Sequence, residues 1–236
     1  MNPDIAAALA EMDKVGVSNL EHPGSWALDP ASCRFLAAFI RAIKAARVLE
    51  FGSGFSSLMI ARELAGKEGN LLYSVDDSEQ YSALAKEGVE NSEARANVEF
   101  RVAPLRPKFY GPRLLLAYGL PPGLLEAKGP FDLVLIDAPH HDYGREAVLY
   151  DAFPAVAPGG YLILDDANRE GMERDYVRSW QLAYGDALQA THLEGIGNGL
   201  SVIEKFDDEP RGPLPLADSL RISLKTIRNC ARLLGR

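Results

Sequence analysis

Several acidic residues and a short glycine-containing loop are of the types that could bind a charged ligand. In RVLEFGSGFSSLMIA, Glu50 stands directly before a loop that contains Gly52 and Gly54. Glycine lets the backbone approach a ligand closely, because no Cβ stands in the way. Acids end several apolar runs of the chain, at Glu50, Asp76, Asp137, Asp165 and Asp166. We therefore expect one shared pocket that these carboxylates line.

The stretch IDAPHHDYGREA offers groups for proton transfer. Two of the four histidines of the chain, His140 and His141, lie here beside Asp137. An imidazole titrates near neutral pH and can take a proton from a hydroxyl, so we take these three residues as candidate catalytic residues. A solvated loop with incidental histidines is the alternative. Arg145 and Arg169 could bind an anionic acceptor, although salt bridges to the nearby acids are the favoured interpretation.

The elements that must position these residues alternate along the chain. Strands are expected where the runs RVLEF, NLLYSVD, NVEFRVA, FDLVLIDA and GGYLILDDA stand, with helical patterns between them. Apolar strands without alternation, separated by helices, indicate a parallel sheet buried on both faces. A closing strand pair around Gly-Asn-Gly, within residues 190–205, indicates an antiparallel edge. Ligands of such sheets bind at the carboxyl ends of the strands, where the acids lie.

Three segments divide the chain. Residues 46–206 carry the alternating pattern and form the ligand-binding core, and residues 1–45 are a helical segment that could cap the substrate. Residues 207–236 are a helical extension. Within the core, the proline-rich stretch 104–130 breaks the alternation. It is interpreted either as a substrate lid or as a plain surface excursion with one short helix.

Composition limits the partners. The 236 residues carry a net charge of −8, which argues against a general affinity for nucleic acid. No apolar run approaches the ~20 residues of a membrane span, and the two cysteines lack a C-x-x-C partner, so we expect a cytoplasmic protein with reduced thiols. The basic segment 221–236 could contact an anionic surface, although a solvated amphipathic helix is the favoured interpretation. A helix over 216–234 could dock on its own domain or on a second copy, which would give a homodimer.

Two ligands fit the glycine loop. Gly52 and Gly54 match the start of the dinucleotide fingerprint G-x-G-x-x-G, but Ser57 stands at its third glycine. Asp76 lies at the distance along the chain expected of an acid that binds ribose hydroxyls. Glu50 would repel a pyrophosphate and would favour a cationic ligand. S-adenosylmethionine (SAM) carries a sulfonium, an ammonium and a ribose diol, so the loop favours SAM over NAD(P).

Four motifs in order, E-F-G-S-G-F-S, V-D-D, F-D-L-V-L-I-D-A and P-G-G-Y-L-I-L-D-D, resemble class I SAM-dependent methyltransferases, nearest to small-molecule O-methyltransferases. The resemblance covers residues 25–205. It implies a Rossmann-like, doubly wound α/β sheet of seven strands in the order 3-2-1-4-5-7-6, with strand 7 antiparallel and helices on both faces. It also implies methylation of a hydroxyl on a sugar, a glycan precursor or a natural product. An NAD(P)-dependent Rossmann oxidoreductase and a non-catalytic SAM-binding module stay open as alternatives.

The resemblance further implies a cofactor site. The residues of this site are ordered from the methionine end of SAM, through its ribose and adenine, to its methyl group. They are Glu50, Gly52, Gly54, Ser56, Asp76, Asp77, Val102, Ala103 and Asp137. Ser56 is a departure, because the family often has a third glycine at that position. By position alone, candidate contacts to the small-molecule acceptor are Trp26, Tyr110, Tyr118, Tyr143 and Asn198.

A metal is the last open point. Catechol-type and caffeoyl-CoA-type relatives hold Mg²⁺ or another divalent cation with an aspartate after the fourth strand and an Asp-Asn pair after the fifth. Asp137, Asp165 and Asp166 would match this set, with an aspartate in place of the asparagine, and hard cations prefer such oxygen ligands. Arg145 and Arg169 fit metal-independent relatives instead, so the resemblance leaves metal dependence open.

Overall fold

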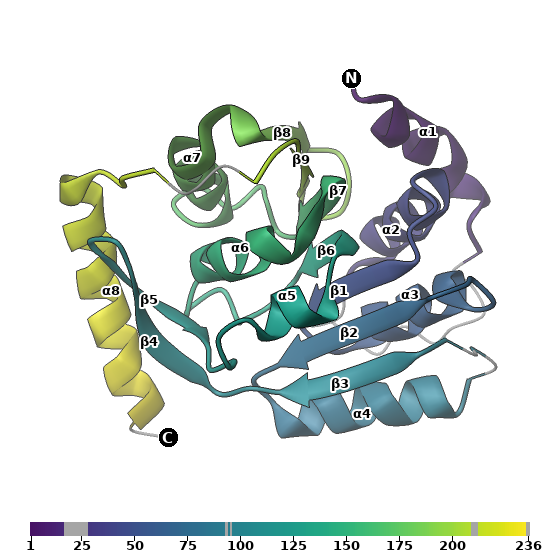
Figure 1. Ribbon diagram of the computed structural model, residues 1–236, viewed down its shortest axis with the longest axis horizontal. Coiled ribbons are helices and arrows are strands. Elements are labelled where there is room, and N and C mark those ends of the chain that lie inside the picture. Colours follow the sequence, from purple (N-terminus) through teal and green to yellow (C-terminus); the bar gives the residue numbers. More distant parts are fainter. Residues whose placement is uncertain (17–27, 93, 95, 209–211, 235–236) are drawn as a thin grey trace.

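A seven-stranded sheet forms the centre of the computed structural model, which describes residues 1–16, 28–92, 94, 96–208 and 212–234, with the backbone alone for 231–234. The spatial order is β3-β2-β1-β6-β7-β9-β8 (Figure 1). These strands are β1 (Arg47–Phe51), β2 (Leu71–Asp76), β3 (Val98–Val102), β6 (Phe131–Ile136), β7 (Val156–Leu164), β8 (Leu188–Leu193) and β9 (Leu200–Lys205). Only β9 runs antiparallel to its neighbours, β7 and β8. Counted within this sheet the order is 3-2-1-4-5-7-6, so the expected fold class is confirmed.

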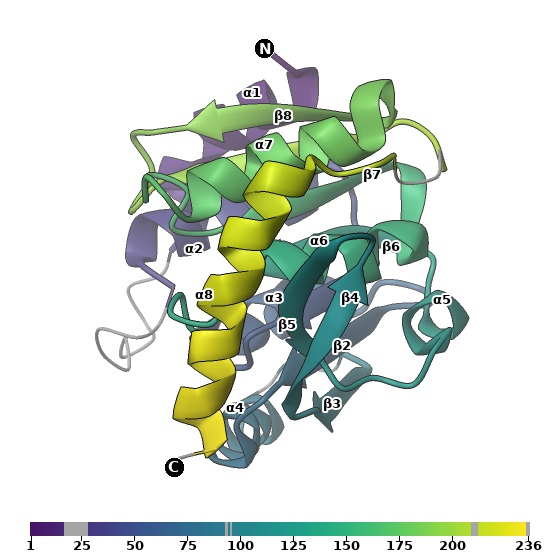
Figure 2. The ribbon, with the colours of Figure 1, turned by 90° about the vertical axis from the view of Figure 1, so that its left-hand side faces the viewer.

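Helices cover both faces of the sheet (Figures 1 and 2). One face carries α1 (Pro3–Glu11), α2 (Pro30–Ala42), α3 (Phe55–Leu64) and α4 (Glu79–Glu90), and the other carries α5 (Leu124–Lys128), α6 (Glu146–Ala152) and α7 (Glu173–Tyr184). Short 3-10 turns follow α1, α6 and α7, at Met12–Lys14, Phe153–Ala155 and Gly185–Ala187. The last helix is α8 (Leu216–Leu234). None of the helices in the described ranges is long and apolar enough to cross a membrane.

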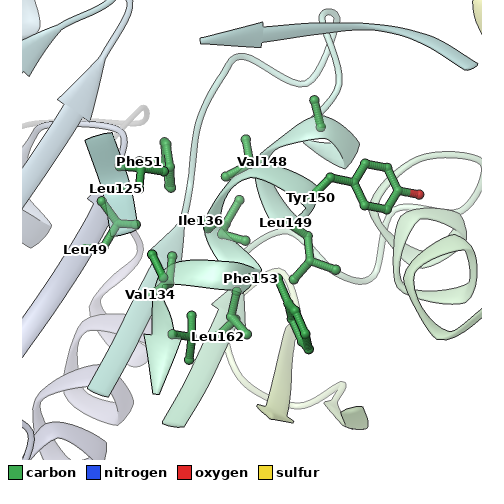
Figure 3. Close-up of a cluster of buried hydrophobic side chains, with 14 of the residues drawn as sticks. Leu49, Phe51, Leu125, Val134, Ile136, Val148, Leu149, Tyr150, Phe153 and Leu162 are labelled. Carbon is green, nitrogen blue, oxygen red and sulfur yellow. The ribbon is translucent and has the colours of Figure 1, made fainter. Parts of the chain in front are cut away.

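Alternate side chains of each central strand enter different cores. In β1, Leu49 and Phe51 pack with α6 and α7, whereas Val48 packs with α2 and α3. Figure 3 shows the first of these cores, where Val134 and Ile136 of β6 lie against Leu149 of α6. Burial of both faces explains why the central strands are mostly apolar without alternation. It also fixes the parallel register that brings the acidic strand ends to one edge.

Residues 105–118 form a β-hairpin that the sequence did not predict. β4 (Leu105–Tyr110) pairs antiparallel with β5 (Arg113–Tyr118) in a separate two-stranded sheet, and the expected short helix follows as α5. Pro107 is tolerated because β4 is an edge strand. α8 lies along β5, where the Ser223 hydroxyl accepts the N–H of Leu114 at 2.9 Å. Figure 2 shows α8 and the hairpin side by side.

Candidate active site

The loop after β1 depends on two glycines for different reasons. Gly52 has φ +106°, and a Cβ there would lie 3.0 Å from the Cβ of Ala138. Gly52 therefore permits the close contact between the ends of β1 and β6. Gly54 is extended, and a Cβ on it would meet no atom within 4 Å. The open side of this loop is thus at Gly54.

Glu50 lies beneath the loop and is fully buried. Its Oε2 accepts hydrogen bonds from the hydroxyls of Ser57 at 2.5 Å and Ser74 at 2.6 Å. The Ser57 hydroxyl also accepts the N–H of Gly54 at 3.0 Å. Burial raises the pKa of Glu50 to about 7, although serine hydroxyls lower it in part. Ser57, which breaks the dinucleotide fingerprint, therefore joins the carboxyl group to the open loop.

Asp76 ends β2 and holds the same loop from the other side. Its Oδ2 accepts the N–H of Ser53 at 2.7 Å, and its Oδ1 accepts the N–H of Ser78 at 2.7 Å. Burial raises the pKa of Asp76 to about 6, although these N–H groups lower it in part. Burial also raises the pKa of Asp77, and His140 partly offsets this shift. Asp77 therefore lies toward the histidine loop.

The two residues expected to flank adenine lie beside Asp76. The N–H of Ala103 donates to the Asp76 carbonyl at 2.8 Å, and the Ala103 side chain is buried. Val102 is 42% exposed. The adenine contact itself stays a prediction.

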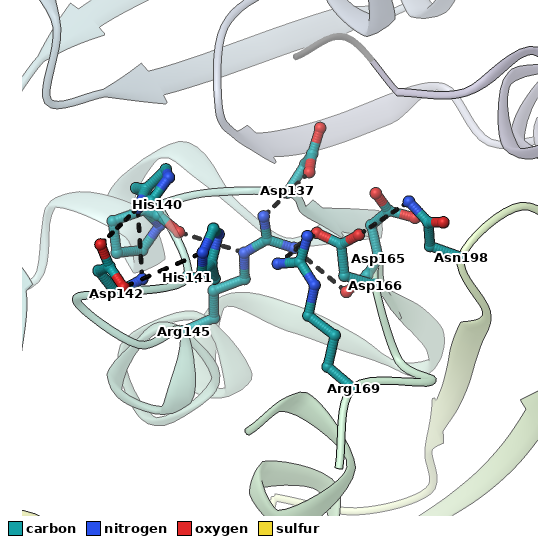
Figure 4. A network of polar contacts seen from close by, with 10 residues as sticks. Asp137, His140, His141, Asp142, Arg145, Asp165, Asp166, Arg169 and Asn198 are labelled. Atoms are coloured by element: carbon teal, nitrogen blue, oxygen red, sulfur yellow. Dashed lines mark hydrogen bonds and ion pairs between the residues drawn. The ribbon is translucent and has the colours of Figure 1, made fainter. Parts of the chain in front are cut away.

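Asp137, Asp165 and Asp166 meet where β6 and β7 end, with their carboxylate oxygens within 4.8 Å of one another. The buried guanidinium of Arg145 joins them (Figure 4). It lies 3.2 Å from Asp137 Oδ1 and 3.2 Å from Asp166 Oδ2, and it donates to the Asp165 carbonyl at 3.1 Å. The prediction that Arg145 forms salt bridges with nearby acids is confirmed.

A second cation and an amide complete this cluster. Arg169 lies 3.0 Å from Asp166 Oδ2, and Asn198 donates to Asp166 Oδ1 at 3.2 Å. The β8–β9 turn carries Asn198 there because Gly199 adopts φ +88°, where a Cβ would overlap Asn168. Asn198, expected only by position, thus belongs to the cluster.

Burial sets the charge of the cluster. It raises the pKa of Asp137 to about 6, although Arg145 lowers it in part. Burial and the two neighbouring carboxylates raise the pKa of Asp165 well above its usual range. Both effects favour the protonated form of Asp165. The guanidinium groups of Arg145 and Arg169 lie against the other two acids, Asp137 and Asp166.

The two histidines stack beside this cluster, with ring centroids 4.0 Å apart. The N–H of Asp142 donates to Nδ1 of His140 at 3.3 Å, which leaves the proton of a neutral His140 ring on Nε2. Burial, His140 and Arg169 lower the pKa of His141, so its ring is neutral near pH 7. His141, with its neutral ring, is thus the candidate proton acceptor of the pair.

Tyr118 of β5 brings a hydroxyl to the same edge. Its ring packs against Phe51 with centroids 5.3 Å apart, and among the described residues its buried hydroxyl has no hydrogen-bond partner. Burial raises the Tyr118 pKa, and Asp77, Asp76 and Asp137 raise it further. The hydroxyl is therefore near the acids at the ends of β2 and β6.

The other residues predicted by position to contact the acceptor lie in different places. The Tyr110 hydroxyl donates to Asp151 at 2.7 Å. Tyr143 lines a separate cavity between α6, α7 and α8. Trp26 lies outside the described residues.

Sequence reasoning missed two buried polar groups. The Ser74 hydroxyl supports Glu50 from the middle of an apolar strand. Glu173, in the first turn of α7, is fully buried, and neither of its carboxylate oxygens has a hydrogen-bond partner within the described part of the chain. Burial raises its pKa, and Arg145 lowers it in part. An acid in a first helical turn is common, so no sequence signal marked Glu173.

The sheet order defines a Rossmann-like fold, and in such folds ligands bind at the carboxyl ends of the strands, where the polar edge of β2, β1 and β6 lies. A family model described as "Methyltransferase domain" matches residues 49–167, half of the chain. The chain belongs to this family of methyltransferase domains. The resemblance read from the four sequence motifs is thereby confirmed.

Individual relatives agree with this assignment. The O-methyltransferase hkm8 of Aspergillus hancockii is 26% identical over 194 residues, which are 81% of this chain and 68% of that protein. A Bacillus cereus O-methyltransferase solved with SAH (S-adenosylhomocysteine) has a TM-score of 0.58 at 19% identity, covering 87% of this chain and 91% of its own. The O-methyltransferase TomG of Streptomyces achromogenes, involved in tomaymycin synthesis and solved with SAM, has a TM-score of 0.59 at 19% identity, covering 88% and 91%. The two structures share the fold of this chain.

Proposed function

We propose that this protein is a SAM-dependent O-methyltransferase that acts on a small-molecule hydroxyl. The observation that carries the proposal is the arrangement at the sheet edge. The open side of Gly54, the acids Asp76 and Asp77, and the cluster around Asp137 lie at the ends of three adjacent strands. The names of the relatives support O-methylation, and the SAH and SAM in the two similar structures support the cofactor. Sugars, glycan precursors and natural products all fall within this acceptor class.

The residues at this edge divide the work of methyl transfer. When bound, SAM supplies an electrophilic methyl carbon on a sulfonium. Asp76 and Asp77 would hold the ribose hydroxyls, and the open side of Gly54 would face the amino-acid end. His141 takes the proton of the acceptor hydroxyl as its oxygen attacks, because its lowered pKa keeps the ring unprotonated. Arg145 holds Asp137 in place beside the reacting groups.

The three-aspartate set does not fit a divalent cation well. The Arg145 guanidinium already joins Asp137 and Asp166, and Arg169 also neutralises Asp166. A divalent ion would have to displace a guanidinium that is almost completely buried. We therefore propose that methyl transfer here is independent of metal. Turnover should be unchanged in EDTA and after readdition of Mg²⁺, and loss of turnover in chelator would contradict this.

Calorimetry tests the proposed cofactor. Titration with SAM and SAH should give saturable binding, and NAD and NADP should give none. Gly54→Ala should abolish adenosyl binding without unfolding the chain, because the extended backbone accepts any residue and the Cβ meets no protein atom. Gly195→Ala, at another glycine with open space around it, is the matched control. Binding of NAD but of neither adenosyl ligand would identify an oxidoreductase instead.

Turnover separates an enzyme from a binding module. A screen of small-molecule alcohols and phenols with SAM should yield SAH together with a methyl ether. Saturable SAM binding with no SAH from any acceptor would favour the non-catalytic module.

The two thiols, Cys33 and Cys230, are both free, which agrees with the proposed cytoplasmic location.

A further inference from the structure

α8 is attached to the fold by its polar side. The hydroxyls of Ser219 and Ser223 contact Arg113 and Leu114 of β5, and Asn229 donates to the carbonyl of Asp142. Ser219, Thr226 and Asn229 are buried and Ile222 packs against the core, whereas Leu216, Leu220 and Leu224 are exposed. Most surface helices have the opposite arrangement, with the apolar side on the core.

The apolar side of α8 faces outward as a continuous row, which we call the outer stripe. It consists of Leu216, Leu220, Leu224 and Ile227, which are 70%, 66%, 60% and 55% exposed. At about 100° per residue these four positions fall within an arc of about 80°, over a length of about 17 Å. A row of this kind marks an interaction surface, whereas single exposed leucines do not.

A basic flank borders the outer stripe on one side. It consists of Arg221, Lys225 and Arg228, which are all exposed. Residues 216–234 contain four Lys or Arg against one Asp, so the helix carries +3 in a chain of −8, and the remaining chain carries −11. The partner of this surface should therefore be both apolar and anionic.

A second copy of the chain satisfies this requirement poorly. Two antiparallel helices related by a two-fold axis would bring equivalent flanks together, so Arg221 and Arg228 would face like charges. The four apolar side chains bury roughly 100 Å² each, a figure that follows from their usual burial energy. The sum of about 400 Å² is half of the ~800 Å² per partner found in stable complexes.

We propose that α8 docks the protein onto a lipid surface that carries anionic headgroups. The outer stripe enters the boundary between headgroups and acyl chains, and the basic flank lies at the level of the phosphates. α8 lies on such a surface and does not cross it, in agreement with the absence of a spanning helix in the described ranges. This surface is separate from the candidate active site and does not depend on the proposed reaction.

Sedimentation with vesicles tests the proposal on the whole protein. The chain should bind vesicles of phosphatidylcholine mixed with phosphatidylserine, and should bind vesicles of phosphatidylcholine alone far more weakly. Leu220→Glu with Leu224→Glu should lower the partition coefficient at least 10-fold. Arg221→Gln with Lys225→Gln and Arg228→Gln should lower it about 100-fold, because each cation near an anionic surface contributes about 10-fold or less.

Leu84→Glu and Lys86→Gln on α4 are the matched controls, because both side chains are exposed. They should bind vesicles like the wild type, and all variants should keep the wild-type circular dichroism spectrum. Equal binding to neutral and anionic vesicles, or no binding, would overturn the proposal. A dimer in light scattering that Leu220→Glu with Leu224→Glu dissociates would also overturn it, since a second copy would then cover the outer stripe.

Discussion

The Tyr118 hydroxyl is a buried donor without a hydrogen-bond partner among the described residues, and we expect a bound ligand to supply one. Removing it with Tyr118→Phe should leave the free protein equally stable or up to about 1 kcal/mol more stable, because an unpaired buried hydroxyl is costly. The same change should lower kcat/KM at least about 5-fold, the effect of one lost hydrogen bond. Thermal unfolding and steady-state kinetics measure the two effects.

Tyr110→Phe is the matched control for this change. The Tyr110 hydroxyl donates to Asp151 at 2.7 Å, so its loss should cost about 1 kcal/mol of stability and leave the kinetics unchanged. If Tyr118→Phe destabilised the free protein and kept full activity, the hydroxyl would have a structural role.

The histidine pair gives a prediction about pH. His141→Gln should lower kcat by about 10²- to 10⁴-fold, the usual contribution of a positioned base. His140→Gln should lower it less than about 10-fold, because Nδ1 of His140 is occupied by the N–H of Asp142. A base must be unprotonated, so wild-type activity should rise with pH through the lowered pKa of His141 and level off above about 6.5. His141 would be excluded as the base if the rise of activity with pH were centred above about pH 6.5, or if the same rise remained in His141→Gln.

At the scale of elements, one buried ion pair joins the β4–β5 hairpin to α6. The guanidinium of Arg113 contacts the Glu146 carboxylate and lies 3.0 Å from the Ser179 hydroxyl. Glu146 also accepts the Tyr150 hydroxyl at 3.0 Å, and both ionic groups are almost completely buried. The hairpin in turn carries Tyr118 into the candidate site and supports α8.

Arg113→Ala should therefore destabilise the protein by about 3–5 kcal/mol, because it leaves the Glu146 carboxylate buried without its cation. Lys108→Ala on the same hairpin removes an exposed contact to Asp151 and should cost less than about 1 kcal/mol. Urea denaturation measures both changes. Equal losses in the two variants would show that the hairpin does not depend on the buried pair.

The sequence predicted those elements whose structure follows from their own pattern of apolar residues. It did not predict elements whose structure depends on contacts with residues far away in the chain. The strands that end at Phe51, Asp76 and Ile136 are mostly apolar without alternation, and this identified both the parallel sheet and its acidic edge. The hairpin at 105–118 contains a proline and two charged residues in β4, so it showed no strand pattern. Its structure depends on Glu146 and on Ser223 of α8, which lie far away in the chain.

The same limit applied within the candidate site. The acids could be predicted because they end strands, but the position of Arg145 between Asp137 and Asp166 could not. That position requires a loop from Asp137 to Arg145 that folds back on itself, and spacing alone does not define such a loop. In sequence Ser57 stands at the place of a missing glycine, whereas in the structure its hydroxyl links Glu50 to the N–H of Gly54.

For the whole molecule, acids concentrated at one edge predict how stability changes with pH. Burial raises the pKa of Glu50 to about 7 and those of Asp76 and Asp137 to about 6. Between about pH 4 and pH 7 the folded chain thus keeps protons that the unfolded chain has released, so stability falls as pH rises through this window. The ligand-free protein should melt at a higher temperature near pH 5.5 than near pH 8. A melting temperature that rises over this range would contradict the burial of these acids.

Glu50→Gln isolates the largest of these contributions. The amide keeps the shape of the side chain and has no titrating proton, so the variant should gain stability near pH 8, on the order of 3 kcal/mol for a pKa displaced from 4.5 to about 7. Glu87→Gln, at an exposed position of α4, should leave the pH dependence unchanged. If Glu50 serves the methionine end of SAM, calorimetry should show weaker SAM binding by the same stabilised variant. Greater stability with undiminished SAM affinity would mean that the carboxylate holds only the serines of its own loop.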